Sequence, residues 1–184
     1  MSSILLHEVK GKSEILTFNN PEKLNILSEE MLEKLSAALL KSSSNPSTHV
    51  VILRSTGKAF CAGHDLKEMQ EARANNDGGL DYFKSLFKKC SNLMMQIKNL
   101  PKPVIAEVQG VATAAGCQLV ATCDIAVASD TARFGVNGVN IGLFCSTPMV
   151  ALSRNIGRKK TFEMLVTGDF INAMEAKEAG LVNH

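Results

Sequence analysis

Short apolar runs alternate with amphipathic stretches along the chain, and no repeat of fixed period is present. Apolar runs rich in β-branched residues predict buried strands. We expect such strands at residues 4–9, 15–19, 49–54, 104–108 and 124–128. Apolar residues spaced three and four positions apart predict helices. We expect one helix that starts after the N-cap Ser28 and carries the apolar stripe Met31, Leu32, Leu35 and Leu39. A second group of helices is expected at 66–73 and 82–98, and another helix follows the small residues 110–116 and ends at about residue 122. Short helices are expected at 147–155, 159–166 and 173–178.

Strands followed by helices favour an α/β or α/β-spiral architecture. No linker divides the 184 residues, so residues 1–184 are predicted to form a single domain. Residues 75–79 are the most loop-like stretch and a candidate mobile segment. The last residues predict a helix end followed by a strand from Leu181 that has no later neighbour. We therefore expect the chain to be a fragment.

Composition narrows the function classes. The chain is 45% hydrophobic and 21% charged, with a formal net charge of +2 and no basic or acidic block. This argues against nucleic acid or an acidic membrane as the main partner. The apolar stretches are too short for a membrane helix, and the start resembles neither a signal peptide nor an Arg-rich presequence. These features predict a soluble intracellular protein without membrane insertion.

Five cysteines lie at positions 61, 90, 117, 123 and 145. None forms a C-x-x-C pair or has a histidine at zinc-ligand spacing. We expect reduced thiols packed as small apolar side chains, and no metal site.

Two loops of small residues, 60–66 and 109–118, each lie between a predicted strand and a predicted helix. Small residues let the backbone approach a ligand closely, and a helix start directs unpaired N–H groups at it. Two such loops facing each other would form an oxyanion hole, which stabilises a developing enolate or alkoxide. The alternative is that both are only tight strand-to-helix turns.

The loops also carry a family resemblance. Residues 58–69 and 103–124 resemble the two oxyanion loops of the crotonase (enoyl-CoA hydratase/isomerase) superfamily. Residues 20–25 are similar to its N-terminal signature, and residues 160–182 to its later helices. The order is preserved over nearly the whole chain. Residues 138–148 resemble a narrower subgroup.

The resemblance implies a crotonase-type spiral of ββα units, here truncated before the C-terminal helical segment, that binds an acyl-CoA thioester. Backbone N–H groups of His64 and Ala115 would bind the thioester carbonyl. Coenzyme A, part of the substrate and the only cofactor implied, would contact Lys23, Leu24, Ala62, Asp65 and Leu66. Full-length members assemble as homotrimers or hexamers. Their setting is fatty-acid or acyl-CoA metabolism, in the cytoplasm of a bacterium or the mitochondrial matrix of a eukaryote.

Departures from the family pattern bear on the chemistry. The position of the first hydratase glutamate is Gln118, and that of the second is Gly138. The nearest match to the isomerase carboxylate is Ser146. A carboxylate that exchanges a proton contributes about 10²–10⁴-fold in rate. Neither an amide nor a glycine can replace it, so Gln118 would at most orient a water. The methyl groups of Ala114 and Ala115 replace part of the usual glycine run and would narrow the pocket.

Other titratable side chains have two interpretations each. The His64 imidazole is functional, acting in acid–base chemistry or contacting coenzyme A, or it faces solvent. Glu68 pairs with it or is a surface residue. Glu107 points toward the pocket or away from it. Cys117 and Cys145 are nucleophiles or core residues, and the absence of a nearby base favours the core. Asp124 is expected to bind the adjoining backbone.

Two functions follow from the sequence. One is a thioester-transforming enzyme with an atypical base, and the other is a non-catalytic acyl-CoA-binding or regulatory protein. Because no later residues follow, we also expect an exposed apolar face that promotes self-association. Its predicted members are Met164, Leu165, Ile171, Ala173, Leu181 and Val182.

Overall fold

Two β-sheets form the frame of the computed structural model, which describes residues 3–184. The larger sheet has five strands in the order β1-β2-β3-β5-β7, with β1 antiparallel to β2 and the others parallel. Its strands are β1 (Leu5–Lys10), β2 (Ser13–Phe18), β3 (Val50–Ser55), β5 (Val104–Val108) and β7 (Ile125–Ala128). All five were predicted, with ends displaced by at most two residues.

The smaller sheet was not predicted. Its order is β4-β6-β8-β9, with only β9 antiparallel. The strands are β4 (Ala59–Cys61), β6 (Val111–Thr113), β8 (Arg133–Gly135) and β9 (Ile171–Asn172). Strands of two or three residues are too short to show an alternating pattern, so hydrophobic periodicity does not predict them.

Seven α-helices and two 3-10 helices complete the described part of the chain. The α-helices are α1 (Glu29–Ser44), α2 (Leu66–Ala72), α3 (Leu80–Lys98), α4 (Ala115–Thr122), α5 (Ser146–Asn155), α6 (Arg158–Thr167) and α7 (Ala173–Glu178). The 3-10 helices are η1 (Pro21–Lys23) and η2 (Asn137–Ile141). Ser28 caps α1 as predicted, because its hydroxyl accepts a hydrogen bond from the Met31 N–H at 3.2 Å.

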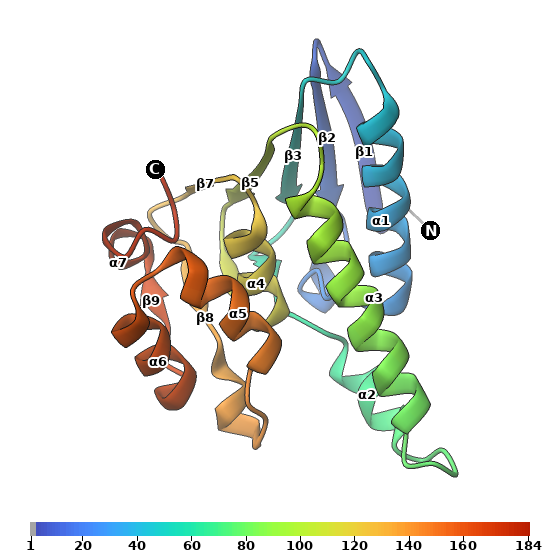
Figure 1. Cartoon of the computed structure of the whole chain (residues 1–184), viewed down its shortest axis with the longest axis vertical. Helices are drawn as coiled ribbons and strands as arrows, with labels where there is room; N and C mark the ends of the chain where they lie inside the picture. The colour runs from blue at the N-terminus through green and yellow to red at the C-terminus, as the bar shows by residue number, and fades with distance from the viewer. Residues whose placement is uncertain (1–2) are drawn as a thin grey trace.

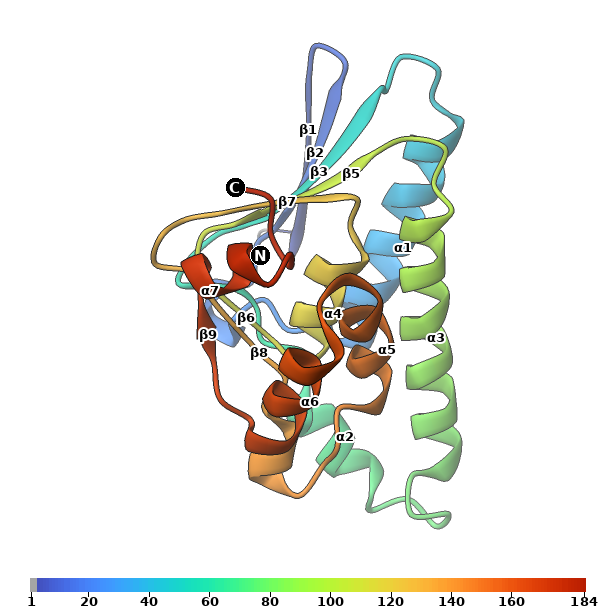
Figure 2. The same ribbon diagram turned by 60° about the vertical axis from the view of Figure 1, so that its left-hand side comes forward.

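The chain repeats one ββα pattern. The pairs β3/β4, β5/β6 and β7/β8 each give one strand to each sheet, and helices follow each pair. Helix α1 packs on β1 and β2 and lies beside α3, while α4 lies deeper in the molecule (Figures 1 and 2). This order is the spiral that the sequence predicted.

Apolar side chains join the two sheets. Phe18 of β2 and Phe60 of β4 are fully buried, and their rings meet edge to face with centroids 5.6 Å apart. Phe134 of β8 is also fully buried. Burying a side chain of this size stabilises the fold by about 1.5–3 kcal/mol, so this cluster holds the smaller sheet in place.

The prediction of an exposed apolar face near residue 184 was wrong. Met164, Leu165, Ile171, Leu181 and Val182 are all at most 5% exposed. Ala173 is half-buried and packs against the core. The apolar side chains that are exposed on these helices are Phe162, Val166 and Met174.

The predicted strand from Leu181 is also absent, yet the segment has a neighbour. The Asn183 N–H donates to the Ala126 carbonyl, and the Ala128 N–H donates to the His184 carbonyl, both at 2.8 Å. The segment therefore runs along β7, in agreement with the position of the C-terminus beside that strand (Figure 2).

None of the helices described between residues 3 and 184 combines the length and hydrophobicity needed to cross a membrane. The expectation about a leader rests partly on residues 1–2, which lie outside the described part.

Candidate active site

Three loops leave the same edge of the smaller sheet. Strands β4, β6 and β8 are parallel neighbours, with Cys61 opposite Ala112 and Thr113 opposite Gly135. The carboxyl ends of parallel strands meet at one edge, where ligands of open α/β sheets bind. The first loop (residues 62–65), the second loop (Ala114, leading into α4) and the segment 136–138 start there.

Backbone hydrogen bonds brace the first loop against the 20–27 segment. The Leu27 N–H donates to the Gly63 carbonyl at 2.7 Å, and the Ala62 N–H donates to the Leu24 carbonyl at 3.1 Å. Asn25 is fully buried in the left-handed region, with φ of 52°. Its Nδ2 donates to the Ala59 carbonyl at 2.8 Å, next to the loop. The resemblance at residues 20–25 therefore marks a structural brace.

The second loop turns sharply at Ala114. This residue has φ of 51° and ψ of −122°, a conformation that favours glycine. Its N–H donates to the Gly135 carbonyl at 3.0 Å, which fixes the turn against β8. Helix α4 begins at Ala115 without a side-chain cap. Its first N–H groups have no acceptor within the helix, and the helix dipole adds partial positive charge there.

Gly63 brings the two loops into contact. A Cβ atom on residue 63 would lie 3.0 Å from the Ala114 Cβ and 3.3 Å from the Ala115 backbone nitrogen. Its φ of 92° also favours glycine. His64 and Ala115 line the same cavity of about 350 Å³, the smaller cavity. The structure thus brings together the two residues that the sequence singled out.

The His64 imidazole points inward. Its Nδ1 lies 3.4 Å from the Leu27 carbonyl oxygen, and its ring meets Phe87 edge to face with centroids 5.8 Å apart. Its Nε2 is covered by protein and has no hydrogen-bond partner among residues 3–184. Burial lowers the pKa of His64 below its usual 6.5, so the ring is neutral at neutral pH.

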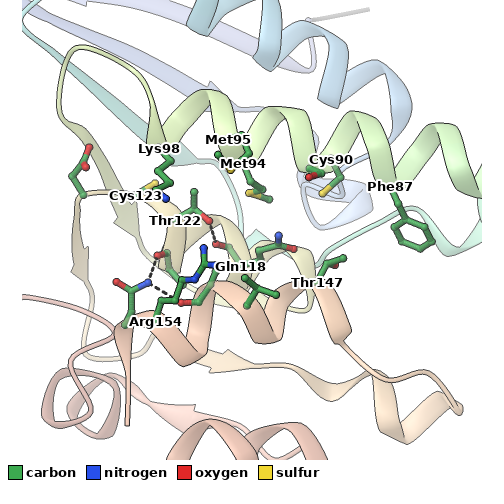
Figure 3. A pocket seen from close by; sticks show the side chains of 16 residues that line it. Phe87, Cys90, Met94, Met95, Lys98, Gln118, Thr122, Cys123, Thr147 and Arg154 are labelled. Atoms are coloured by element: carbon green, nitrogen blue, oxygen red, sulfur yellow. Dashed lines mark hydrogen bonds between the residues drawn. The ribbon is translucent and has the colours of Figure 1, made fainter. Parts of the chain in front are cut away.

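The two hydratase positions lie on different cavities. Gly138 lines the smaller cavity, as does Ser146. Gln118, 7% exposed, lines a larger cavity of about 520 Å³ between α3, α4 and α5 (Figure 3). Phe87 and Thr147 line both cavities, which are therefore adjacent. In the described chain no charged residue lines the smaller cavity.

Several lining residues were missed by the sequence analysis. Phe87 and Met69 lie on helices α3 and α2, where they look like ordinary members of an apolar stripe. Asn137 follows β8 and accepts a hydrogen bond from the Thr113 hydroxyl at 2.6 Å. The apolar residues Leu143 and Phe144 also line the cavity. Of these residues, only Asn137 had a local sequence signal, because a polar residue just after a strand is a candidate for a site at the sheet edge.

This geometry agrees with comparisons to known proteins. The sequence profile described as enoyl-CoA hydratase/isomerase matches residues 11–184. The chain belongs to this family. The enoyl-CoA hydratase/isomerase fold also appears in solved structures: an enoyl-CoA hydratase from Mycobacterium smegmatis superimposes with a TM-score of 0.94 at 54% identity, covering 99% of this chain and 69% of that one.

The resemblance of residues 138–148 to a narrower subgroup is confirmed by the relatives that match nearly the whole chain. The chain is 48% identical over 182 residues to enoyl-CoA hydratase domain-containing protein 3, mitochondrial, from Danio rerio, covering 99% of this chain and 61% of the relative. The human protein of that name is 49% identical over 168 residues, covering 91% and 54%. Its crystal structure superimposes with a TM-score of 0.91 at 46% identity, covering 98% of this chain and 69% of that one. The chain thus spans 54–61% of the length of these two curated relatives.

The residues that the family resemblance assigned to coenzyme A fall into two groups. Ala62 and Leu66 line the smaller cavity. Lys23, Leu24 and Asp65 lie beside it without lining either described cavity. The Lys23 Nζ is 3.8 Å from Asp65 Oδ2, and Asp65 also caps α2 by accepting from the Lys67 N–H at 2.9 Å. Lys23 is 61% exposed, so its ammonium remains accessible to an anion.

The contacts of the remaining titratable candidates differ from residue to residue. Glu68 accepts from the Glu29 N–H at 3.2 Å and forms no described bond to His64. Glu107 is exposed and lines neither described cavity. Asp124 accepts from the Val104 N–H at 2.8 Å, as expected. Burial raises the pKa of Cys117 to about 12 and also raises that of Cys145, so both thiols are poor nucleophiles.

No group of three or more metal-ligating side chains is found in the part of the chain that the structure describes.

Proposed function

We propose that this chain binds acyl-CoA thioesters in the smaller cavity, with the thioester carbonyl at the backbone N–H groups of His64 and Ala115. The observation that carries the proposal is the contact of Gly63 with Ala114 and Ala115, which places the two loops on one side of the same cavity. Both donors are backbone groups and are independent of the side chains that differ from the family pattern. The α4 dipole adds to their attraction for a partially negative oxygen.

Coenzyme A would extend from the cavity over the 20–25 segment. Ala62 and Leu66 form the cavity wall nearest that segment, and Leu24 accepts the hydrogen bond of Ala62. The exposed ammonium of Lys23 offers a point charge to a phosphate. Asp65 holds this lysine by an ion pair and fixes the start of α2.

The same residues favour binding without hydration. Among residues 3–184 no carboxylate lines the smaller cavity, Gly138 offers no side chain, and the Gln118 amide lines the other cavity. Asp124, the carboxylate of the larger cavity, already accepts a backbone hydrogen bond. Without a group that exchanges protons, two contributions of about 10²–10⁴-fold each are lost. We therefore infer a non-catalytic acyl-CoA-binding protein of fatty-acid or acyl-CoA metabolism.

A catalytic role with His64 as the base is the second candidate. It is favoured by the neutral imidazole and by Nε2, which lacks a partner in the described structure. Against it, the same Nε2 is covered by protein and not open to the cavity. Turnover of any member of a panel of enoyl- and acyl-CoA thioesters, abolished by His64→Gln, would establish this second function.

Assembly and location belong to the same proposal. We propose the trimers or hexamers that the family resemblance implies for full-length members. The vertebrate relatives are named mitochondrial. For a eukaryotic source we propose the mitochondrial matrix, and for a bacterial source the cytoplasm.

The test compares butyryl-CoA with S-butyl-CoA, a thioether that lacks only the carbonyl oxygen. Isothermal titration calorimetry should give about tenfold tighter binding of the thioester, the value of two neutral hydrogen bonds of about 0.7 kcal/mol each. Gly63→Ala should remove this difference, because the added methyl displaces the loop. The matched control is Gly11→Ala, which also has a positive φ but has nothing within 4 Å of the added atom. Equal binding of the two compounds by the unaltered chain would refute the proposed carbonyl site.

A further inference from the structure

The larger cavity has no role in the function proposed so far. It measures about 520 Å³, within the range of small-molecule sites, and lies between α3, α4 and α5 (Figure 3). It adjoins the smaller cavity at Phe87 and Thr147, which line both. The two cavities are therefore neighbours, and these two residues lie between the site proposed for the thioester and the larger cavity.

The larger cavity changes character along its length. Phe87 lies at one end, Lys98 and Arg154 lie toward the other, and Met94 and Met95 lie along α3 between them (Figure 3). From Phe87 to Lys98 the helix advances about 16 Å at its usual rise per residue. The cavity thus extends from the aromatic ring of Phe87 to two cationic side chains at its far end.

Two cations, Lys98 and Arg154, and one carboxylate, Asp124, line the larger cavity. Neither Lys98 nor Arg154 forms an ion pair in residues 3–184. Asp124 is the carboxylate in the lining of the described cavity, and its Oδ2 accepts from the Val104 N–H. An arginine guanidinium and a lysine ammonium on one cavity are suited to binding a carboxylate.

Gln118 shows that this cavity is suited to polar contents. Its side chain is 93% buried against the cavity, and its Oε1 has no hydrogen-bond partner within the described chain. Leaving a buried acceptor unsatisfied costs about 1–3 kcal/mol. A water retained beside the bound chain would satisfy this oxygen, because neither a hydrocarbon nor a carboxylate has a hydrogen to donate.

We propose that the larger cavity receives the distal part of the acyl chain and that Lys98 and Arg154 bind a carboxylate at its end. The preferred ligands are then long-chain acyl-CoA thioesters whose acyl chain carries a free carboxylate at its far end. This inference rests on the proposed function, because the thioester in the smaller cavity sets the position of the chain.

The test compares hexadecanoyl-CoA with the mono-CoA thioester of hexadecanedioic acid, which differ only at the distal end. In calorimetric titrations of the whole chain at low salt, the dicarboxylic compound should bind at least about tenfold more tightly. The double variant Lys98→Gln, Arg154→Gln should bind both compounds equally. Its affinity for hexadecanoyl-CoA should stay within about twofold of the unaltered chain.

The matched control is Lys88→Gln, Arg158→Gln, which removes two exposed cations that do not line either described cavity. This variant should keep the preference. Raising the ionic strength should reduce the preference of the unaltered chain without any substitution, because salt screens exposed charges.

Three outcomes separate the two proposals. Equal affinity of the unaltered chain for both thioesters overturns the distal carboxylate site and leaves the proposed function intact. A preference that persists in the Lys98 and Arg154 double variant also overturns it. If neither long-chain thioester binds and butyryl-CoA does not bind either, both the proposed function and this inference are overturned.

Discussion

Gly116 packs directly against the carbonyl oxygen of Cys61, so closely that a Cβ atom on residue 116 would overlap it. Cys61 ends β4, and Gly116 lies in the first turn of α4. The contact therefore sets the distance between the first loop and the helix that follows the second loop. It complements the contact of Gly63 with Ala115, and together they fix the mutual position of the two proposed donors.

Gly116→Ala should therefore destabilise the fold and disturb the site. Forcing an added methyl into a packed interior costs about 1–3 kcal/mol, and we expect that loss in the free energy of unfolding by urea. Gly157→Ala is the control, since residue 157 has an ordinary φ and nothing within 4 Å of the added atom. The control should lose less than about 1 kcal/mol, as for a changed helix cap. Equal losses in both variants would show that the contact with Cys61 is not tight.

Ala114→Gly should act in the opposite direction. Ala114 holds φ of 51° and ψ of −122°, a strained conformation for any residue with a Cβ. Such strain costs about 1–3 kcal/mol, which the substitution removes. The greater freedom of glycine in the unfolded chain offsets about 0.4–1 kcal/mol of this gain. We expect a net gain of about 1 kcal/mol in the free energy of unfolding.

Ala115→Gly is the matched control for Ala114→Gly. It removes the same methyl one residue later, where the backbone is helical and glycine costs about 1 kcal/mol. Opposite signs at adjacent positions would establish the strain. A loss of stability at both positions would contradict it.

The strands of the larger sheet and the main helices were predictable, because each carries its own hydrophobic period. The smaller sheet was not, since its strands have at most three residues and exist through pairing with distant segments. Its register nevertheless positions His64, Ala115 and Gly138 at one edge. These positions were predicted from resemblance, but the separation of Gln118 from Gly138 into two cavities depends on how α3, α4 and α5 pack.

The apolar residues near the end show the same limit. Leu181 and Val182 looked uncovered because no later sequence follows them. In the structure they are covered by earlier elements, as the segment from Leu181 bonds along β7. Sequence periodicity identifies an apolar face but does not say which distant element will cover it.

Restoring glutamate at the hydratase positions should not restore hydration. Gln118→Glu keeps the size of the side chain. At Gly138, however, even a Cβ atom would lie 2.8 Å from the Leu143 carbonyl oxygen and 2.9 Å from the Cys145 sulfur. The segment that follows η2 is thus folded against the glycine and leaves no room for the second carboxylate.

We expect the unaltered chain to hydrate crotonyl-CoA far more slowly than the roughly 10 s⁻¹ of a typical enzyme. The double variant Gln118→Glu, Gly138→Glu should show no gain over Gln118→Glu alone, and it should be less stable. The loss of enoyl-thioester absorbance measures the rate, and thermal melting measures the stability. A double variant that is both stable and faster would show that the 139–145 segment adapts readily.

His64 should make the fold sensitive to mild acid. Burial lowers its pKa in the folded state below the usual 6.5, so the unfolded chain binds a proton more readily as the pH falls below about 6.5. The full contribution to stability is present above that pH. It is lost as the pH falls toward the folded-state pKa, with a slope of at most about 1.4 kcal/mol per pH unit for one proton.

The measurement compares urea unfolding of the unaltered chain and of His64→Gln between about pH 4.5 and about pH 8, a range that brackets the usual pKa of histidine. The unaltered chain should lose more stability than the variant on going from pH 7 to pH 5. Because both chains share every other titratable group, the difference isolates His64. His49→Gln, which removes an exposed imidazole, should follow the unaltered chain. Parallel curves for the unaltered chain and His64→Gln would mean that the imidazole is protonated equally in the folded and unfolded states, and that the cover provided by Leu27 and Phe87 does not exclude water from it.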